Sequence, residues 1–187
     1  MNKPLLAGAF ALALLAPGLT PAASWAKTAP ATRAVRADAA TQNFVDKVWN
    51  TNNFEIEAGQ EAQNKANIQE YLDYARMIVR DHVKAGSELN TILGQNGLSA
   101  PDALDNEHKN LLQQLSSETG ARFEEQFRKQ QISGHEKAIK LFQNYAKSGR
   151  NEALKTWAQN TLPTLENHLR DAEALPRPVL RSTQAEQ

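Results

Sequence analysis

The sequence predicts an all-helical protein: a ferritin-like four-helix bundle in which a long connection between the second and third long helices contains a short extra helix. Two observations indicate this fold class. Apolar residues recur at helical spacing in four long segments, and no segment shows the alternating pattern of a strand. Aromatic residues make up only 6% of the chain, whereas residues that favour helices, such as Ala, Leu, Gln and Glu, are abundant.

Residues 1–26 have the pattern of a cleavable secretory signal peptide. Lys3 precedes an apolar run from Leu5 to Ala16, and small residues follow as far as Ala26, after which we expect cleavage. The run is shorter than the roughly 20 residues that a membrane-spanning helix needs, so we expect no transmembrane anchor after cleavage. A retained anchor is the alternative. The expected location is the periplasm or the cell exterior.

One helical domain is predicted over residues 41–175. Residues 27–40 are expected to form a flexible linker, and residues 176–187 a disordered tail, because both are polar, contain proline and lack apolar periodicity. The chain has no cysteine, which excludes disulfides and thiolate metal ligands. Lys and Arg together number 21, as do Asp and Glu, so no net charge favours nucleic-acid binding.

The long helices are expected over about 41–65, 68–95, 121–147 and 151–175. Short connections after the first and third predict two antiparallel hairpins. The connection between the hairpins is longer, with a proline-containing loop over 97–104 and a short helix over 105–116, and a link of this kind can run the length of a ferritin-like bundle. Pro163 predicts that the last helix is kinked, or that it breaks into two helices with Thr161 capping the second.

Each long helix places one ionisable residue within its apolar stripe: Glu55, His82, His135 and His168. Their spacing from neighbouring apolar residues is close to whole helical turns, so their side chains are expected to point into the core. Counted from the helix starts, three of them lie at a similar depth, and His168 lies about one turn deeper. Burying a lone carboxylate costs several kcal/mol, so Glu55 should have a partner among the histidines or a shared cation.

One carboxylate and three imidazoles suit a single divalent transition metal such as zinc, copper or iron. We therefore predict a binding protein with these four residues as ligands. The alternative is an envelope protein, structural or stress-related, that acts through a protein partner and uses the buried set only to fix the register of its helices. Both hypotheses involve a non-enzymatic protein.

Enzymatic motifs are not found. Di-iron oxidases use two Glu-x-x-His pairs, but the residues three positions before the core histidines are apolar: Val79, Ile132 and Leu165. The chain has no glycine-rich phosphate loop, metalloprotease motif or serine-hydrolase elbow. The sequence therefore favours binding over catalysis.

Three glycines lie near the core polar residues. Gly59 and Gly86 follow Glu55 and His82 by one turn, and Gly134 adjoins His135. A mid-helix glycine costs about 1 kcal/mol relative to alanine, so we expect that space is needed at this level, either for side chains or for close helix packing.

Three other polar residues are expected to lie outside this set of four. Asp81 is expected to face outward or toward a neighbouring helix, pairing with Arg80 or Lys84. Glu124 is interpreted as a solvated glutamate near a helix start, with a second polar layer as the alternative. His108 is interpreted as a surface residue.

Several short motifs follow one another along the chain in a distinctive order. They are Phe54-Glu55-Ile56, Asp81-His82, Phe123-Glu124, His135, Leu162-Pro163 and His168-Leu169. In order and spacing this set resembles an exported ferritin-like bacterial family known as a domain of unknown function, whose members are often labelled membrane or outer-membrane proteins. The resemblance covers about residues 41–175. It implies a ferritin-like bundle and no particular activity. Glu124 and Phe127 stand where that family tends to have Asp and Tyr, which weakens the case for a second polar layer.

Overall fold

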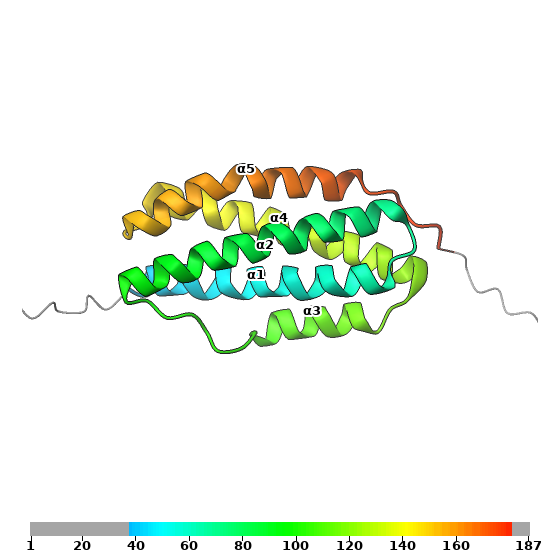
Figure 1. Cartoon of the computed structure of the whole chain (residues 1–187), viewed down its shortest axis with the longest axis horizontal. Helices are drawn as coiled ribbons and strands as arrows, with labels where there is room; N and C mark the ends of the chain where they lie inside the picture. The colour runs from blue at the N-terminus through cyan, green and yellow to red at the C-terminus, as the bar shows by residue number, and fades with distance from the viewer. Residues whose placement is uncertain (1–37, 181–187) are drawn as a thin grey trace, which may run out of the picture. The chain divides into compact units, whose positions relative to one another are not determined.

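The computed structural model describes residues 38–180 (Figure 1). The predicted signal peptide, nearly all of the predicted linker and the end of the predicted tail lie outside these residues. The described part contains helices and no strands, which confirms the all-helical class. The helices are α1 (Ala39–Lys65), α2 (Gln69–Asn96), α3 (Asn106–Ser116), α4 (Gly120–Ser148) and α5 (Glu152–Ala174). Each boundary lies within two residues of the one expected from the sequence.

Side-chain caps explain where several helices begin. The Asp38 carboxylate accepts hydrogen bonds from the backbone N–H groups of Ala40 and Thr41, both at 3.1 Å, so α1 starts two residues inside the predicted linker. Asp105 caps α3 and Asn151 caps α5 in the same way. At the other end of α2, Gly97 adopts the left-handed conformation with φ of 63°, which only glycine adopts without strain.

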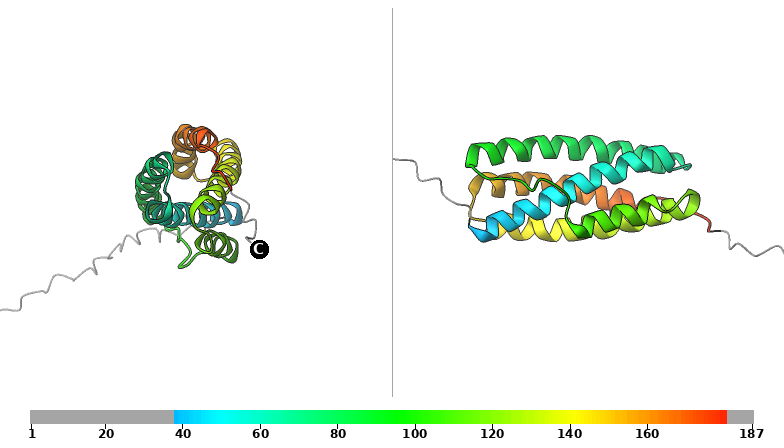
Figure 2. Two further views of the ribbon diagram at one scale, coloured as in Figure 1. Left: turned by 90° about the vertical axis from the view of Figure 1, so that its right-hand side faces the viewer. Right: turned by 90° about the horizontal axis from the view of Figure 1, so that it is seen from below.

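The long helices form two antiparallel hairpins that pack against each other. Helices α1 and α2 make the first hairpin and α4 and α5 the second, while α1 also packs on α4 and α2 on α5 (Figures 1 and 2). The connection that contains α3 runs back along the outside of α1 and α4, so α2 and α4 point in the same direction. None of the helices within residues 38–180 combines the length and the apolar character needed to span a membrane.

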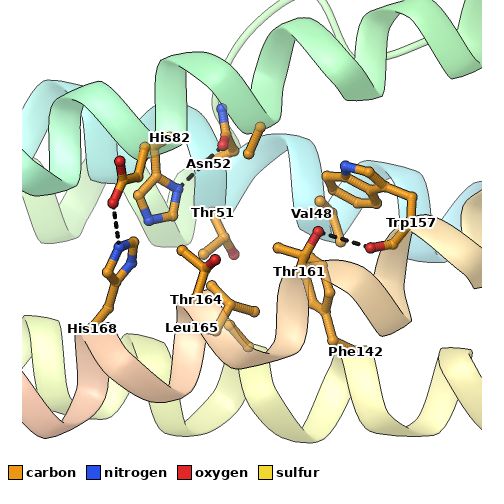
Figure 3. A pocket seen from close by; sticks show the side chains of 13 residues that line it. Val48, Thr51, Asn52, His82, Phe142, Trp157, Thr161, Thr164, Leu165 and His168 are labelled. Atoms are coloured by element: carbon orange, nitrogen blue, oxygen red, sulfur yellow. Dashed lines mark hydrogen bonds and ion pairs between the residues drawn. The ribbon is translucent and has the colours of Figure 1, made fainter.

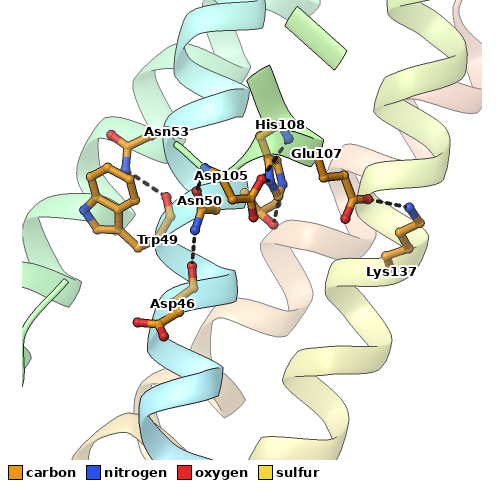
Figure 4. Close-up of polar contacts among 9 residues, drawn as sticks. Asp46, Trp49, Asn50, Asn53, Asp105, Glu107, His108 and Lys137 are labelled. Carbon is orange, nitrogen blue, oxygen red and sulfur yellow. Dashed lines mark hydrogen bonds and ion pairs between the residues drawn. The ribbon is translucent and has the colours of Figure 1, made fainter. Parts of the chain in front are cut away.

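Polar contacts at both ends hold α3 on the outside of α1. At its start, the Asn50 side chain accepts a hydrogen bond from the Asp105 N–H at 2.7 Å and donates one to the Asp46 carbonyl at 2.8 Å (Figure 4). At its end, the Lys65 ammonium donates to the Ser116 carbonyl at 2.6 Å. Helix α3 therefore extends from the middle of α1 to its C-terminal end.

The core consists of two apolar clusters with a polar layer between them. One contains Phe44, Leu89, Phe142 and Trp157, and the other contains Phe54, Tyr71, Phe123 and Phe127. Along α2, α4 and α5, the buried histidines lie between residues of the first cluster and residues of the second. The apolar clusters thus shield the polar layer from both ends.

Helix α5 is continuous through Pro163, so the expected break into two helices is wrong. The Thr161 hydroxyl does not cap a new helix, because it donates to the Trp157 carbonyl within the same helix at 2.8 Å. Proline removes one helical hydrogen bond. Burial of Trp157 and Leu165 on either side of Pro163 holds both halves of the helix in the core.

Candidate metal centre

Three of the four predicted residues meet in the polar layer. His82 from α2, His135 from α4 and His168 from α5 each offer one ring nitrogen, and these three nitrogens all lie within 4.8 Å of one another. The ring centroids are 5.3 to 5.8 Å apart, and all three side chains are buried. His168 therefore reaches the same level as the other two histidines, although counting from the helix starts placed it one turn away.

Hydrogen bonds determine which nitrogen carries the proton in two of the rings. His135 Nδ1 lies 2.9 Å from the Gln131 backbone oxygen, and His168 Nε2 lies 3.1 Å from Asp81 Oδ2. A carbonyl and a carboxylate accept hydrogen bonds and cannot donate them, so each of these nitrogens is the N–H donor. The opposite nitrogens, His135 Nε2 and His168 Nδ1, then carry lone pairs.

The third ring follows the same pattern. His82 Nδ1 lies 3.2 Å from the Asn52 side-chain oxygen on α1, and Figure 3 shows this contact. His82 Nε2 is buried and has no hydrogen-bond partner. With its proton on Nδ1, His82 also turns a lone pair toward the other two rings.

The three imidazoles are neutral near pH 7. Burial lowers the pKa of His82 well below its usual 6.5, and it lowers the pKa of His135 to about 4. Burial also lowers the pKa of His168, and the hydrogen bond to Asp81 opposes this shift only in part. Neutral imidazole is the form that binds metal ions. In this form, however, His135 Nε2 and His168 Nδ1 face each other with two lone pairs at 3.3 Å.

Glu55 is buried in the same layer but does not join the three converging nitrogens. One of its carboxylate oxygens accepts a hydrogen bond from the Gln131 side-chain amide. The other, Oε1, has no hydrogen-bond partner and lies 3.9 Å from His135 Nδ1, the nitrogen that points away from the cluster. The expected set of four converging ligands is therefore corrected to three histidines with Glu55 behind one of them. Burial raises the pKa of Glu55 from 4.5 to about 8.

The three glycines provide space, as expected, but for different neighbours. A Cβ atom on Gly86 would lie 2.8 Å from the Asn52 side-chain nitrogen, and one on Gly134 would lie 3.1 Å from Glu55 Oε1. These two glycines make room for side chains that contact the histidines. A Cβ on Gly59 would lie 2.8 Å from a methyl group of Val79, so this glycine allows α1 and α2 to approach closely.

Asp81 and Asn52 are the functional neighbours that the sequence did not assign. Asp81 was expected to pair with Arg80 or Lys84, and it does accept from Arg80 at 2.9 Å, but its other oxygen accepts from His168. Partial burial raises the pKa of Asp81, but these hydrogen bonds outweigh it and hold the pKa below its usual 3.8. The position of Asp81 next to His82 in the sequence could have indicated its role at the site, whereas nothing in the sequence pointed to Asn52.

The two remaining polar residues lie outside the cluster. Glu124 is only 2% exposed and accepts hydrogen bonds from the backbone N–H groups of Asn67 and Ile68, so its interpretation as a solvated residue is wrong. It closes the turn between α1 and α2. His108 on α3 bonds to Asp105 at 2.8 Å, and its side chain is 14% exposed, so it is more buried than a surface residue.

The fold and the site define an all-helical protein with a buried cluster of three neutral histidines, each held by an acceptor on its outer nitrogen. A family model for a domain of unknown function, DUF4142, matches residues 26–175. The chain therefore belongs to this family. No curated protein and no solved structure matches the chain.

Proposed function

We propose that this protein is an exported, ferritin-like helical-bundle protein that binds one divalent transition-metal ion, such as zinc, copper or iron, through His82 Nε2, His135 Nε2 and His168 Nδ1. The observation that carries the proposal is the orientation of the three rings. Each ring has one nitrogen directed at an oxygen acceptor, and the three rings bring one nitrogen each within 4.8 Å of the others. Metal-bound histidines in proteins usually donate their other N–H group in this way.

The surroundings also provide charge for a buried dication. Three neutral imidazoles leave the ion's two positive charges uncompensated, and burying them without counter-charges would be costly. Asp81 supplies one carboxylate through its hydrogen bond to His168, and Glu55 beside His135 would supply a second once the bound ion displaces the proton that burial holds on it near pH 7. Two carboxylates behind two of the ligands match the charge of a divalent ion.

The purely structural alternative explains fewer of these contacts. A polar network that serves only to fix helix register should satisfy its own hydrogen bonds, because an unpaired buried polar atom costs about 1–3 kcal/mol. Here His82 Nε2 and Glu55 Oε1 have no partner, and the lone pairs of His135 and His168 face each other. A cation would resolve the unpaired His82 nitrogen and the facing lone pairs together.

A function through a protein partner would be supported by an exposed apolar stripe. The large exposed apolar side chains within residues 38–180 are Val83 on α2 and Val179 and Leu180 after α5. They lie on separate segments and form no stripe along a helix. The partner hypothesis therefore remains a prediction without a supporting surface.

Two further parts of the proposal rest on other observations. The ferritin-like assignment is supported by the long connection through α3, which brings α2 and α4 into the same direction, as one long crossover does in ferritin-like folds. Export, to the periplasm or the exterior, is supported by the charge and apolar run of residues 1–26.

The test is metal titration of untagged, chelator-treated protein by calorimetry with Zn²⁺, Cu²⁺ and Fe²⁺. We expect one ion per chain, and we expect the double variant His82→Ala/His135→Ala to lose binding. The matched control is His108→Ala, because His108 is the one histidine of the chain that is not in the cluster, and it lies on α3. Folded wild-type protein that takes up none of these metals would refute the proposal.

A further inference from the structure

A small cavity adjoins the histidine cluster. It has a volume of about 30 Å³, and His82 and His168 border it (Figure 3). The rest of its wall consists of six apolar residues (Val48, Ala85, Ala138, Phe142, Trp157 and Leu165) and five polar ones (Thr51, Asn52, Asp81, Thr161 and Thr164). A single water needs roughly 10–15 Å³ of such volume, so the cavity has room for at most two or three non-hydrogen atoms.

A surface groove lies next to the cavity. This groove, of about 430 Å³, lies between α2 and α5, and residues of both helices line it. The groove and the cavity share five lining residues: Asp81, Ala85, Trp157, Thr161 and Thr164. These residues form the wall between the groove and the histidines. Thr164 is exposed, which places this wall at the protein surface.

The cluster itself has an incomplete ligand set. Three histidines supply three nitrogens, and metal sites with three protein ligands commonly hold a water or a substrate in the remaining position. Glu55 does not supply this position, because it lies behind His135. The cavity is the space beside the imidazoles of His82 and His168 that could hold such a ligand.

We propose that the fourth coordination position of the bound metal opens onto this cavity, where it takes a neutral ligand of one or two non-hydrogen atoms: water at rest, or a diatomic gas in its place. The ligand enters from the groove between α2 and α5. The carboxylate of Asp81 in the wall disfavours an anionic ligand, and the apolar half of the wall would not replace the hydration of a charged ligand. This inference rests on the proposed metal site.

The test uses nitric oxide, a neutral diatomic molecule, added anaerobically to protein loaded with Fe²⁺. Electron paramagnetic resonance should show the signal of a high-spin iron–nitrosyl adduct. Ala85→Leu and Thr164→Leu each add bulk to the wall shared by the groove and the cavity, and both should lose the adduct signal while still binding one Fe²⁺. Val83→Leu enlarges an exposed residue on the same helix that lines neither space, and it should behave as wild type.

The outcomes separate this inference from the proposed function. Wild-type protein that binds none of Zn²⁺, Cu²⁺ and Fe²⁺ would refute both. Protein that binds zinc or copper but no Fe²⁺ would refute the gas-binding position and leave the metal site standing. Protein that binds Fe²⁺ but forms no nitrosyl adduct would refute the open position and leave the metal site standing. Adduct formation that persists in both wall variants would refute the entry route. Because Thr164 is exposed, Thr164→Leu provides a test even if Ala85→Leu does not fold.

Discussion

Replacing Glu55 with glutamine should make the metal-free protein more stable, by an amount that increases with pH. Burial raises the pKa of this carboxyl from 4.5 to about 8, and the hydrogen bond from Gln131 opposes the shift only in part. Between these two values the folded protein retains a proton that the unfolded chain has lost. The free energy of unfolding contributed by Glu55 therefore falls as the pH rises from 4.5 toward 8.

The size of the effect follows from the two pKa values. One pH unit within this interval is worth about 1.4 kcal/mol, so wild-type protein should lose about 2–3 kcal/mol relative to Glu55→Gln between pH 5 and pH 7. The titratable neighbours do not change charge in this range. Burial holds the pKa of His135 at about 4 and the pKa of Tyr74 well above 10. The other histidines are present in both proteins, so their contributions to the free energy of unfolding cancel when wild type is compared with Glu55→Gln.

The measurement is denaturant unfolding of chelator-treated wild type and variant at pH 5, 6 and 7. The matched control is Glu57→Gln, an exposed glutamate on the same helix, which should give a difference from wild type that does not depend on pH. A constant difference between wild type and Glu55→Gln over this range would show that Glu55 ionises normally in the folded protein and would refute the reasoning.

Three other predictions concern the metal site. Asp81→Asn should weaken metal binding about 10- to 100-fold, because it removes the charge that holds His168, and competition with a chromophoric chelator measures the change. Gly86→Ala should weaken metal binding, because the added methyl group displaces the Asn52 side chain that holds His82, and an unchanged affinity in the same chelator competition would contradict this placement. Free Zn²⁺ at about 100 times its Kd should stabilise the chain by about 2.7 kcal/mol and raise its Tm by about 5–10 °C, and chelator should reverse the shift.

The helices and the buried histidines could be predicted because both depend on local patterns. Helix boundaries follow from caps and glycines, and the direction of a side chain follows from the 100° rotation per residue. This rotation placed His82 and His135 in the core. It does not give the axial offset between neighbouring helices, such as α4 and α5, so it placed His168 one turn from its observed level.

The residues that hold the histidine rings, Asp81 and Asn52, could not be predicted because their positions depend on helix–helix contacts. Asp81 and Asn52 lie beside the apolar stripes of their helices, where most polar residues are solvated, and only the packing of α5 and α2 brings them to the histidines. Glu55 was correctly assigned to the buried polar layer, but it lies beside His135 Nδ1 and not among the three converging nitrogens. The role of Glu124 could have been inferred from the turn after α1, whose backbone N–H groups need an acceptor.

The distribution of the histidines over the helices has a mechanical consequence. His82 comes from the first hairpin, whereas His135 and His168 come from the second. An ion held by all three would fasten the hairpins together as a cross-link, in a chain that has no cysteine to form a covalent one. With zinc, which has no redox chemistry, this cross-link would be insensitive to the redox state of the compartment, unlike a disulfide. Neither hairpin could move away from the other without first releasing the metal.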